Sequence, residues 1–132
     1  MSGEVAYLDS SAFVKLIVPE AETPALRRYL RGRSLRASAA LLRTEGIRAV
    51  WRAAPRLLPA ARHALSGLYI VDVDRAMYDA AARLAPAEMR SLDAIHLAAA
   101  LSLGDDLAEV VSYDQRQLAA AVAQGLAVDS PA

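Results

Sequence analysis

Four acidic residues in this 132-residue chain lie next to apolar runs, where a lone carboxylate is costly unless a cation balances it. They are Asp9, Glu45, Asp93 and Asp114. If the four side chains converged they would repel one another, and a hard divalent cation would relieve that repulsion. Mg²⁺ and Mn²⁺ prefer carboxylate oxygens and keep several waters for exchange with a substrate. The pattern therefore predicts a site for Mg²⁺ or Mn²⁺.

Each acid also has an ordinary structural explanation. Asp9 and Asp114 could cap the helices that follow them, because a carboxylate accepts hydrogen bonds from the first backbone N–H groups of a helix. Asp93 could be favoured by the dipole at a helix N-terminus. Glu45 could be a solvated residue paired with a neighbouring arginine. The spacing alone leaves both the metal site and the four separate roles open.

The elements that would position these acids alternate between strand and helix. Short apolar runs predict strands over residues 5–8, 35–38, 68–73, 109–113 and 126–129. Helical spacing predicts helices over residues 12–18, 24–31, 39–53, 75–84, 92–103 and 116–124, with one more between Pro55 and Gly67. This alternation predicts an α/β fold with a central, mainly parallel sheet.

Two of the acids fall where a parallel sheet collects functional groups, which is beyond the carboxyl ends of its strands. Asp9 follows the first predicted strand, and Asp114 follows the fourth. Asp93 lies in the first turn of a helix that we expect Ser91 to cap, and Glu45 lies on the helix after the second strand. Four acids at strand ends and helix starts of one small domain favour a shared site, although the separate roles stay open.

Length and composition limit the class of protein. A chain of 132 residues has the size of one ordinary domain, so we expect a single domain over residues 1–132. The absence of Cys excludes a disulfide scaffold, a Cys-based zinc site and a thiol nucleophile. Because the sequence has neither a targeting signal nor a membrane-spanning run, we expect a soluble protein of the cytoplasm.

The formal net charge of zero hides an uneven distribution. Residues 27–62 contain ten arginines and one acid, a net charge of +9, and the acidic flanks cancel it. A zero net charge taken alone argues against a nucleic-acid partner, which favours a basic surface. The basic middle segment removes that argument, because arginines gathered there can contact phosphates.

Three segments resemble the motifs of PIN domains. Tyr7–Ala12, an apolar strand end followed by Asp and small hydroxyl residues, resembles the opening motif. Ser91–Ala100 is similar to the central motif and is the most specific match, and Val111–Leu118 resembles the last motif. Glu45 falls where the family has its helical Glu. The resemblance covers residues 5–128, and the length and order fit the VapC toxins of bacterial VapBC toxin–antitoxin pairs.

The resemblance implies a three-layer α/β/α fold and a Mg²⁺- or Mn²⁺-dependent endoribonuclease that cleaves RNA. It implies that Asp9 and Asp93 bind the metal and that Asp114 binds it directly or through water. Glu45 would ligate a metal or orient the attacking water. It also implies a cognate VapB-like antitoxin as partner, and a homodimer is expected. Carboxylates that hold a divalent metal suit this reaction, because the metal activates a water to attack the phosphodiester.

Four further residues are weaker candidates for substrate binding. The hydroxyls of Ser11 and Ser112 are expected to tune the site through hydrogen bonds. Arg43 and Arg48, nearest to the Glu45 helix, are candidates for phosphate contacts. Trp51 could stack on a base, but it is expected in the core or an interface.

Other function classes remain as alternatives. A two-histidine nuclease would need His63 and His96, the only histidines, but we expect His96 to be a packing residue and His63 to be exposed. A phosphoacceptor receiver domain needs a lysine late in the chain, and the only one is Lys15. A catalytically inactive PIN-like module that binds RNA or protein, and a PIN ribonuclease outside toxin–antitoxin systems, stay open.

Overall fold

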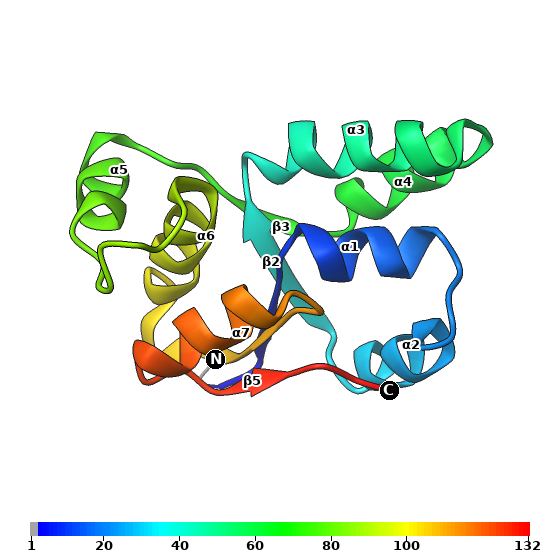
Figure 1. Ribbon diagram of the computed structural model, residues 1–132. Coiled ribbons are helices and arrows are strands. Elements are labelled where there is room, and N and C mark those ends of the chain that lie inside the picture. The colour runs from blue at the N-terminus through cyan, green and yellow to red at the C-terminus, as the bar shows by residue number, and fades with distance from the viewer. Residues whose placement is uncertain (1–2) are drawn as a thin grey trace.

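The computed structural model describes residues 3–132 and contains one five-stranded sheet (Figure 1). Its strands are β1 (Val5–Leu8), β2 (Leu35–Ala39), β3 (Tyr69–Val71), β4 (Leu107–Val111) and β5 (Val128–Asp129). The α-helices are α1 (Ser10–Ile17), α2 (Thr23–Arg31), α3 (Leu42–Ala53), α4 (Leu58–Ser66), α5 (Arg75–Ala82), α6 (Ser91–Leu101) and α7 (Gln115–Ala123). Two short 3₁₀ turns, η1 (Pro55–Leu57) and η2 (Gly104–Asp106), complete the order.

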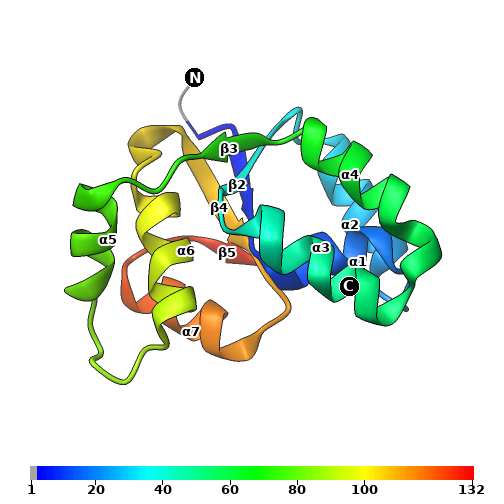
Figure 2. The same ribbon diagram turned by 90° about the horizontal axis from the view of Figure 1, so that it is seen from above.

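The sheet is covered on both faces, which gives three layers. All four strand pairings are parallel, in the order β3-β2-β1-β4-β5. Figure 2 shows α1, α2, α3 and α4 on one side of the sheet and α5, α6 and α7 on the other. The predicted α/β/α fold with a parallel sheet is confirmed. Among residues 3–132, none of the helices is both long enough and apolar enough to cross a membrane.

Side chains of β1 alternate between the two layers, as the twofold period of a strand requires. Tyr7 is fully buried with Leu97 of α6 on one face of the sheet. Ala6 and Leu8 point to the other face, where they pack with Leu26 of α2. Since both faces of β1 are buried, the strand is an apolar run that ends where the first polar residue, Asp9, leaves the sheet.

Helix α3 carries a glycine, Gly46, where the Phe13 ring of α1 packs against it. A Cβ atom built on Gly46 would lie 2.8 Å from Cδ2 of Phe13, closer than real side chains approach. Phe13 is fully buried there against Leu42 and Val50. This close approach places the residue before the glycine, Glu45, against the start of α1.

The strand order also sets where a site can form. From β1 the chain moves to β2 and β3 on one side, and it then returns to β4 and β5 on the other. The adjacent strands β1 and β4 therefore form a topological switch point, and a crevice is expected beyond their carboxyl ends. Register places Leu8 beside Val111, so Asp9 and Ser112 leave the sheet side by side.

Several predicted boundaries were wrong. The strand predicted over 68–73 is only Tyr69–Val71, because β3 is an edge strand whose one partner, β2, ends at Ala39. The strand predicted over 109–113 is Leu107–Val111, since β1 offers no partner beyond Leu8. Ser91 is the first residue of α6 and does not cap it; Arg90 is the N-cap and makes no side-chain capping bond.

Candidate active site

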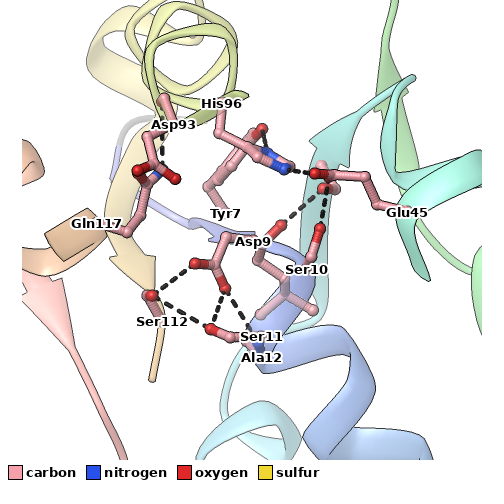
Figure 3. Close-up of polar contacts among 12 residues, drawn as sticks. Tyr7, Asp9, Ser10, Ser11, Ala12, Glu45, Asp93, His96, Ser112 and Gln117 are labelled. Carbon is pink, nitrogen blue, oxygen red and sulfur yellow. Dashed lines mark hydrogen bonds and ion pairs between the residues drawn. The ribbon is translucent and has the colours of Figure 1, made fainter. Parts of the chain in front are cut away.

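One pocket of about 280 Å³ gathers all four predicted acids. Figure 3 shows three of them, Asp9, Glu45 and Asp93. They come from four places in the fold: the end of β1, the first turn of α3, the first turn of α6 and the loop after β4. The pocket is lined by Asp9, Ser10, Ser11, Glu45, Arg90, Ser91, Leu92, Asp93, His96 and Asp114. The structure thus brings together the quartet that the sequence pointed to, at the switch point of the sheet.

Asp9 is held in place by three hydrogen bonds. Its Oδ1 accepts from the backbone N–H of Ala12 at 3.0 Å and from the hydroxyl of Ser11 at 2.6 Å. Its Oδ2 accepts from the hydroxyl of Ser112 at 2.5 Å. Burial raises the pKa of Asp9 although these bonds oppose the rise. Asp9 therefore caps α1 and lines the pocket at once, so its structural and functional interpretations are compatible.

Ser11 and Ser112 also join the loop after β4 to the start of α1. Their hydroxyl oxygens are 3.3 Å apart. Ser11 accepts from the backbone N–H of Tyr113 at 2.8 Å, and Ser112 accepts from that of Asp114 at 3.0 Å. Both serines make the hydrogen bonds expected of site-tuning hydroxyls. Ser112 is fully buried, so it influences the pocket through Asp9.

Glu45 is bound through a single oxygen to two neighbours. Its Oε1 accepts from the hydroxyl of Ser10 at 2.5 Å and lies 2.8 Å from Nε2 of His96. The other ring nitrogen of His96, Nδ1, is 2.7 Å from the hydroxyl of Tyr7. Figure 3 shows this line of contacts running from β1 through α6 to α3. His96 is 3% exposed, so the expectation of a buried histidine with satisfied nitrogens is confirmed.

Asp93 and Asp114 accept fewer hydrogen bonds from the protein than Asp9 and Glu45 do. Partial burial raises the pKa of Asp93, and the nearby charges of Asp114 and Asp9 raise it further. No hydrogen bond to the Asp93 carboxylate is present among residues 3–132; only its backbone carbonyl is near a donor, Nε2 of Gln117, at 3.5 Å. Asp114 caps α7 by accepting from the backbone N–H of Arg116. The second pair of acids is thus more open to an external partner.

The four carboxylates share a pocket without surrounding a common point. Within the part of the chain that the structure describes, no three Asp, Glu or His side chains lie close enough together to enclose a metal ion. Hydrogen bonds turn Asp9 and Glu45 toward the protein, and Asp93 and Asp114 repel each other. The atoms that could ligate a metal here are nonetheless carboxylate oxygens, which suit Mg²⁺ or Mn²⁺ and suit softer metals poorly.

The arginines predicted to bind substrate lie outside this pocket. Arg43 and Arg48 line a second hollow, between α3 and α4, together with Trp51 and Arg62. Trp51 is 57% exposed, with the Arg48 guanidinium 6.0 Å from its ring centroid. Of the two places expected for it, the core was wrong, and an interface stays a prediction. The reason is that Leu42, Gly46 and Val50 are the buried residues of α3, whereas Trp51 lines the hollow.

Sequence reasoning missed three residues of the site. Ser10 and Tyr7 contact Glu45 and His96 across separations of 35 and 89 residues, which no local pattern reveals. Arg90 lines the acidic pocket although it lies outside the arginine-rich segment. Its position directly before the predicted α6 helix was the one available signal.

A comparison with protein-family models matches residues 6–123 to the PIN domain. This chain belongs to the PIN domain family. Within that family it is 49% identical over 125 residues to Ribonuclease VapC46 of Mycobacterium tuberculosis, covering 95% of this chain and 96% of the relative. It is 38% identical over 130 residues to Ribonuclease VapC47 of the same species, with the same coverage. The chain is thus a PIN-domain member of the VapC ribonuclease family.

Two solved structures share the PIN fold. The crystal structure of Mycobacterium tuberculosis VapC20, a sarcin–ricin loop cleaving toxin, matches with a TM-score of 0.73 and 17% identity, over 87% of this chain and 94% of that one. A toxin–antitoxin complex from Klebsiella pneumoniae matches with a TM-score of 0.74 and 19% identity, over 96% and 98%. At these identities the likeness supports the three-layer PIN fold described above.

Proposed function

We propose that this PIN domain, spanning residues 1–132, is a divalent-metal-dependent endoribonuclease that acts as a VapC-type toxin. The observation that carries the proposal is the convergence of four carboxylates from four separate elements on one pocket. Family membership supports it, because relatives 49% and 38% identical over nearly the whole chain are named ribonucleases. The reaction is hydrolysis: water adds to phosphorus and a P–O bond of the RNA chain breaks.

We assign Asp9, Asp93 and Asp114 as ligands of Mg²⁺ or Mn²⁺. When bound there, such an ion supplies an acidified water and neutralises charge on the phosphate. Asp9 presents a carboxylate fixed by its three donors, and Asp93 presents one that the protein leaves unbonded within residues 3–132. The Glu45 carboxylate, which Ser10 and His96 hold in place, serves as a further metal ligand or orients the attacking water.

RNA would reach the acids across the adjoining surfaces. An apolar hollow of about 450 Å³ shares Asp93 with the acidic pocket and has Arg90, Arg116, Met89 and Pro86 on its walls. We place a nucleotide next to the cleaved bond there, with the two guanidinium groups toward its phosphates. Arg43 and Arg48 would contact phosphates of the RNA strand farther from the cleaved bond, which gives affinity without selecting a sequence. Ser11 and Ser112 act on the substrate through Asp9.

A VapB-like antitoxin, a homodimer and a cytoplasmic location complete the proposal. The structural likeness to a toxin–antitoxin complex supports a protein partner for this fold. The proposed RNA substrate supports a location in the cytoplasm. Co-expression with the product of the neighbouring gene, followed by co-purification, tests the partner directly, and light scattering of the purified chain tests the dimer.

Cleavage of a labelled RNA mixture by the purified chain, freed of any partner by unfolding and refolding, tests the activity. We expect cleavage in Mg²⁺ or Mn²⁺ and none in EDTA. Asp93→Asn and Asp9→Asn are each expected to lower the rate at least about 100-fold, because removing a charged group that stabilises the transition state costs that much. Asp74→Asn is the matched control, since Asp74 caps α5 outside the pocket.

Three outcomes separate the alternatives. Equal cleavage in EDTA would contradict the metal mechanism. RNA binding without cleavage in either metal would favour an inactive RNA-binding module. Metal-dependent cleavage, together with failure of the neighbouring gene's product to co-purify with the chain, would favour a PIN ribonuclease outside toxin–antitoxin systems.

A further inference from the structure

Behind Glu45 lies a buried chain of hydrogen-bonding groups that the acidic quartet does not include. The Tyr7 hydroxyl is 2.7 Å from Nδ1 of His96, and Nε2 of His96 is 2.8 Å from Oε1 of Glu45. Tyr7 is 0% exposed, and His96, although it lines the pocket, is 3% exposed with both ring nitrogens engaged by protein groups. We propose that Tyr7 and His96 are positioning residues: the tyrosine fixes which His96 nitrogen carries hydrogen, and the histidine thereby fixes the Glu45 carboxylate. This rests on the proposed function, in which Glu45 takes part in cleavage.

The direction of each hydrogen bond follows from the groups that meet. A phenol is protonated at neutral pH, so the Tyr7 hydroxyl can donate to Nδ1 of His96. The hydrogen of the imidazole must then be on Nε2, which faces a carboxylate that can only accept. The Nε2–H tautomer satisfies both contacts, whereas in the Nδ1–H tautomer a bare Nε2 would face the carboxylate oxygen of Glu45, leaving two acceptors without a hydrogen between them.

The arrangement also explains why one Glu45 oxygen is fixed and the other is not. Both protein donors, Ser10 and His96, bond to Oε1. No hydrogen bond to Oε2 occurs within residues 3–132, so that oxygen can act on a ligand of the pocket. His96 lies one turn after Asp93 on α6, and Tyr7 lies two residues before Asp9 on β1. The chain of bonds therefore links the elements that carry three of the four acids.

A general packing role for His96 predicts different behaviour. The Tyr7 and His96 rings meet edge to face with centroids 5.8 Å apart, and that contact survives if the hydroxyl is removed. Tyr7→Phe therefore keeps the packing and deletes the bond to Nδ1, together with the polar contacts that the hydroxyl makes with Ser38 and the backbone of Ala39. Tyr29→Phe is the matched control, because the Tyr29 hydroxyl is likewise hydrogen-bonded to a side chain, the carboxylate of Glu109, but lies outside the acidic pocket.

The kinetic test compares these variants in the RNA cleavage assay. Tyr7→Phe is expected to lower kcat about 10-fold with KM changed less than about twofold, since it removes one hydrogen bond that orients a group. His96→Gln keeps an amide donor toward Glu45, so it should be at least about 10-fold faster than His96→Leu, which keeps only bulk. Tyr29→Phe should match the wild type. Equal kcat for wild type and Tyr7→Phe, or equal rates for the two His96 variants, would overturn the proposal.

A spectroscopic test needs no activity. The chain has two histidines, and His63 is exposed on α4, so ¹⁵N chemical shifts give one signal set for each. At pH 7.5 we expect His96 as the Nε2–H tautomer in the wild type and a mixture in Tyr7→Phe, with His63 unchanged. An Nδ1–H tautomer in the wild type would refute the proposed bonds even if the variants fold poorly. A wild type that fails to cut RNA contradicts the proposed function, and the tautomer then still decides whether Tyr7 fixes His96.

Discussion

The two sides of the acidic pocket are built differently. On the side of β1 and α3, Asp9 and Glu45 accept five hydrogen bonds from the protein. On the side of α6 and α7, Asp93 accepts none within the described residues, and Asp114 accepts one, from a backbone N–H. The acids of the first side are oriented before any ligand arrives, and the charge of the second side is left for the ligand to balance.

This difference separates two tasks that a nuclease site must perform. Orientation needs hydrogen-bond donors that hold a carboxylate at a fixed place, and these donors leave less of the carboxylate free to bind a cation. Attraction of a cation needs a carboxylate whose charge is not already satisfied, at the cost of repulsion in its absence. The comparison predicts that substitutions on the first side act on stability through lost bonds, and those on the second side act through lost repulsion.

The largest expected effect on stability comes from Asp9→Ala. It removes the acceptor for Ala12 N–H and for the hydroxyls of Ser11 and Ser112 in a buried place. We expect the free energy of unfolding in EDTA to fall by about 1–3 kcal/mol, the cost of leaving buried donors unpaired. Urea denaturation followed by circular dichroism measures it. Asp93→Ala is the matched substitution, and equal losses for the two would remove the distinction between the sides.

A second effect of similar size tests how Glu45 is placed. Gly46→Ala puts a Cβ atom 2.8 Å from the Phe13 ring, so either that buried ring or α3, with Glu45 on it, must shift. We expect a loss of about 1–3 kcal/mol from overpacking, although Ala is the better helix former. In Gly67→Ala the new Cβ would meet its nearest neighbour at 3.6 Å, so this variant serves as control. Unchanged urea midpoints for both would contradict the close approach of α3.

The part of the site that sequence could predict is the part with local signals. Asp9 and Asp114 follow apolar strands, and a parallel sheet brings strand ends to one edge. Asp93 is marked by the motif around it. Even the competing structural explanation was correct for Asp9 and Asp114, which cap α1 and α7 while facing the pocket. A cap and a ligand make the same demand on an aspartate, namely a carboxylate at the start of a helix.

What sequence could not predict depends on contacts between distant segments. The hydrogen bonds among Tyr7, Glu45 and His96 join three elements. They depend on how closely α3 packs against α1, which Gly46 permits. Strand ends were misplaced for the same reason: β3 stops where its single neighbour stops. Proximity along the chain also misled us about Arg43, which is two residues from Glu45 yet lines a different hollow.

A smaller effect concerns metal binding to the second side. Mg²⁺ that binds only the folded chain should raise the free energy of unfolding by about 1.4 kcal/mol at ten times its dissociation constant. We expect Asp93→Asn to lose most of this gain, and Asp79→Asn, an exposed acid on α5, to keep it. Thermal denaturation with increasing Mg²⁺, at constant ionic strength, gives the comparison. A gain that persists in Asp93→Asn would mean that the ion binds elsewhere.

The smallest expected effect is the pH dependence of Asp93 in EDTA. Because burial and its acidic neighbours raise its pKa in the folded chain, the folded state binds the proton more tightly than the unfolded state does. The stability that this proton confers is complete below the ordinary Asp pKa of about 3.9 and is lost as the pH rises through the raised value. At pH 8 Asp93→Asn should therefore melt above the wild type, by an amount that solvent screening of this partly exposed carboxyl keeps small. The gap should close as the pH falls toward 4, since the wild-type carboxyl is then neutral as well. A gap that stays constant with pH would show that the asparagine stabilises the fold by packing, and that Asp93 carries no unbalanced charge.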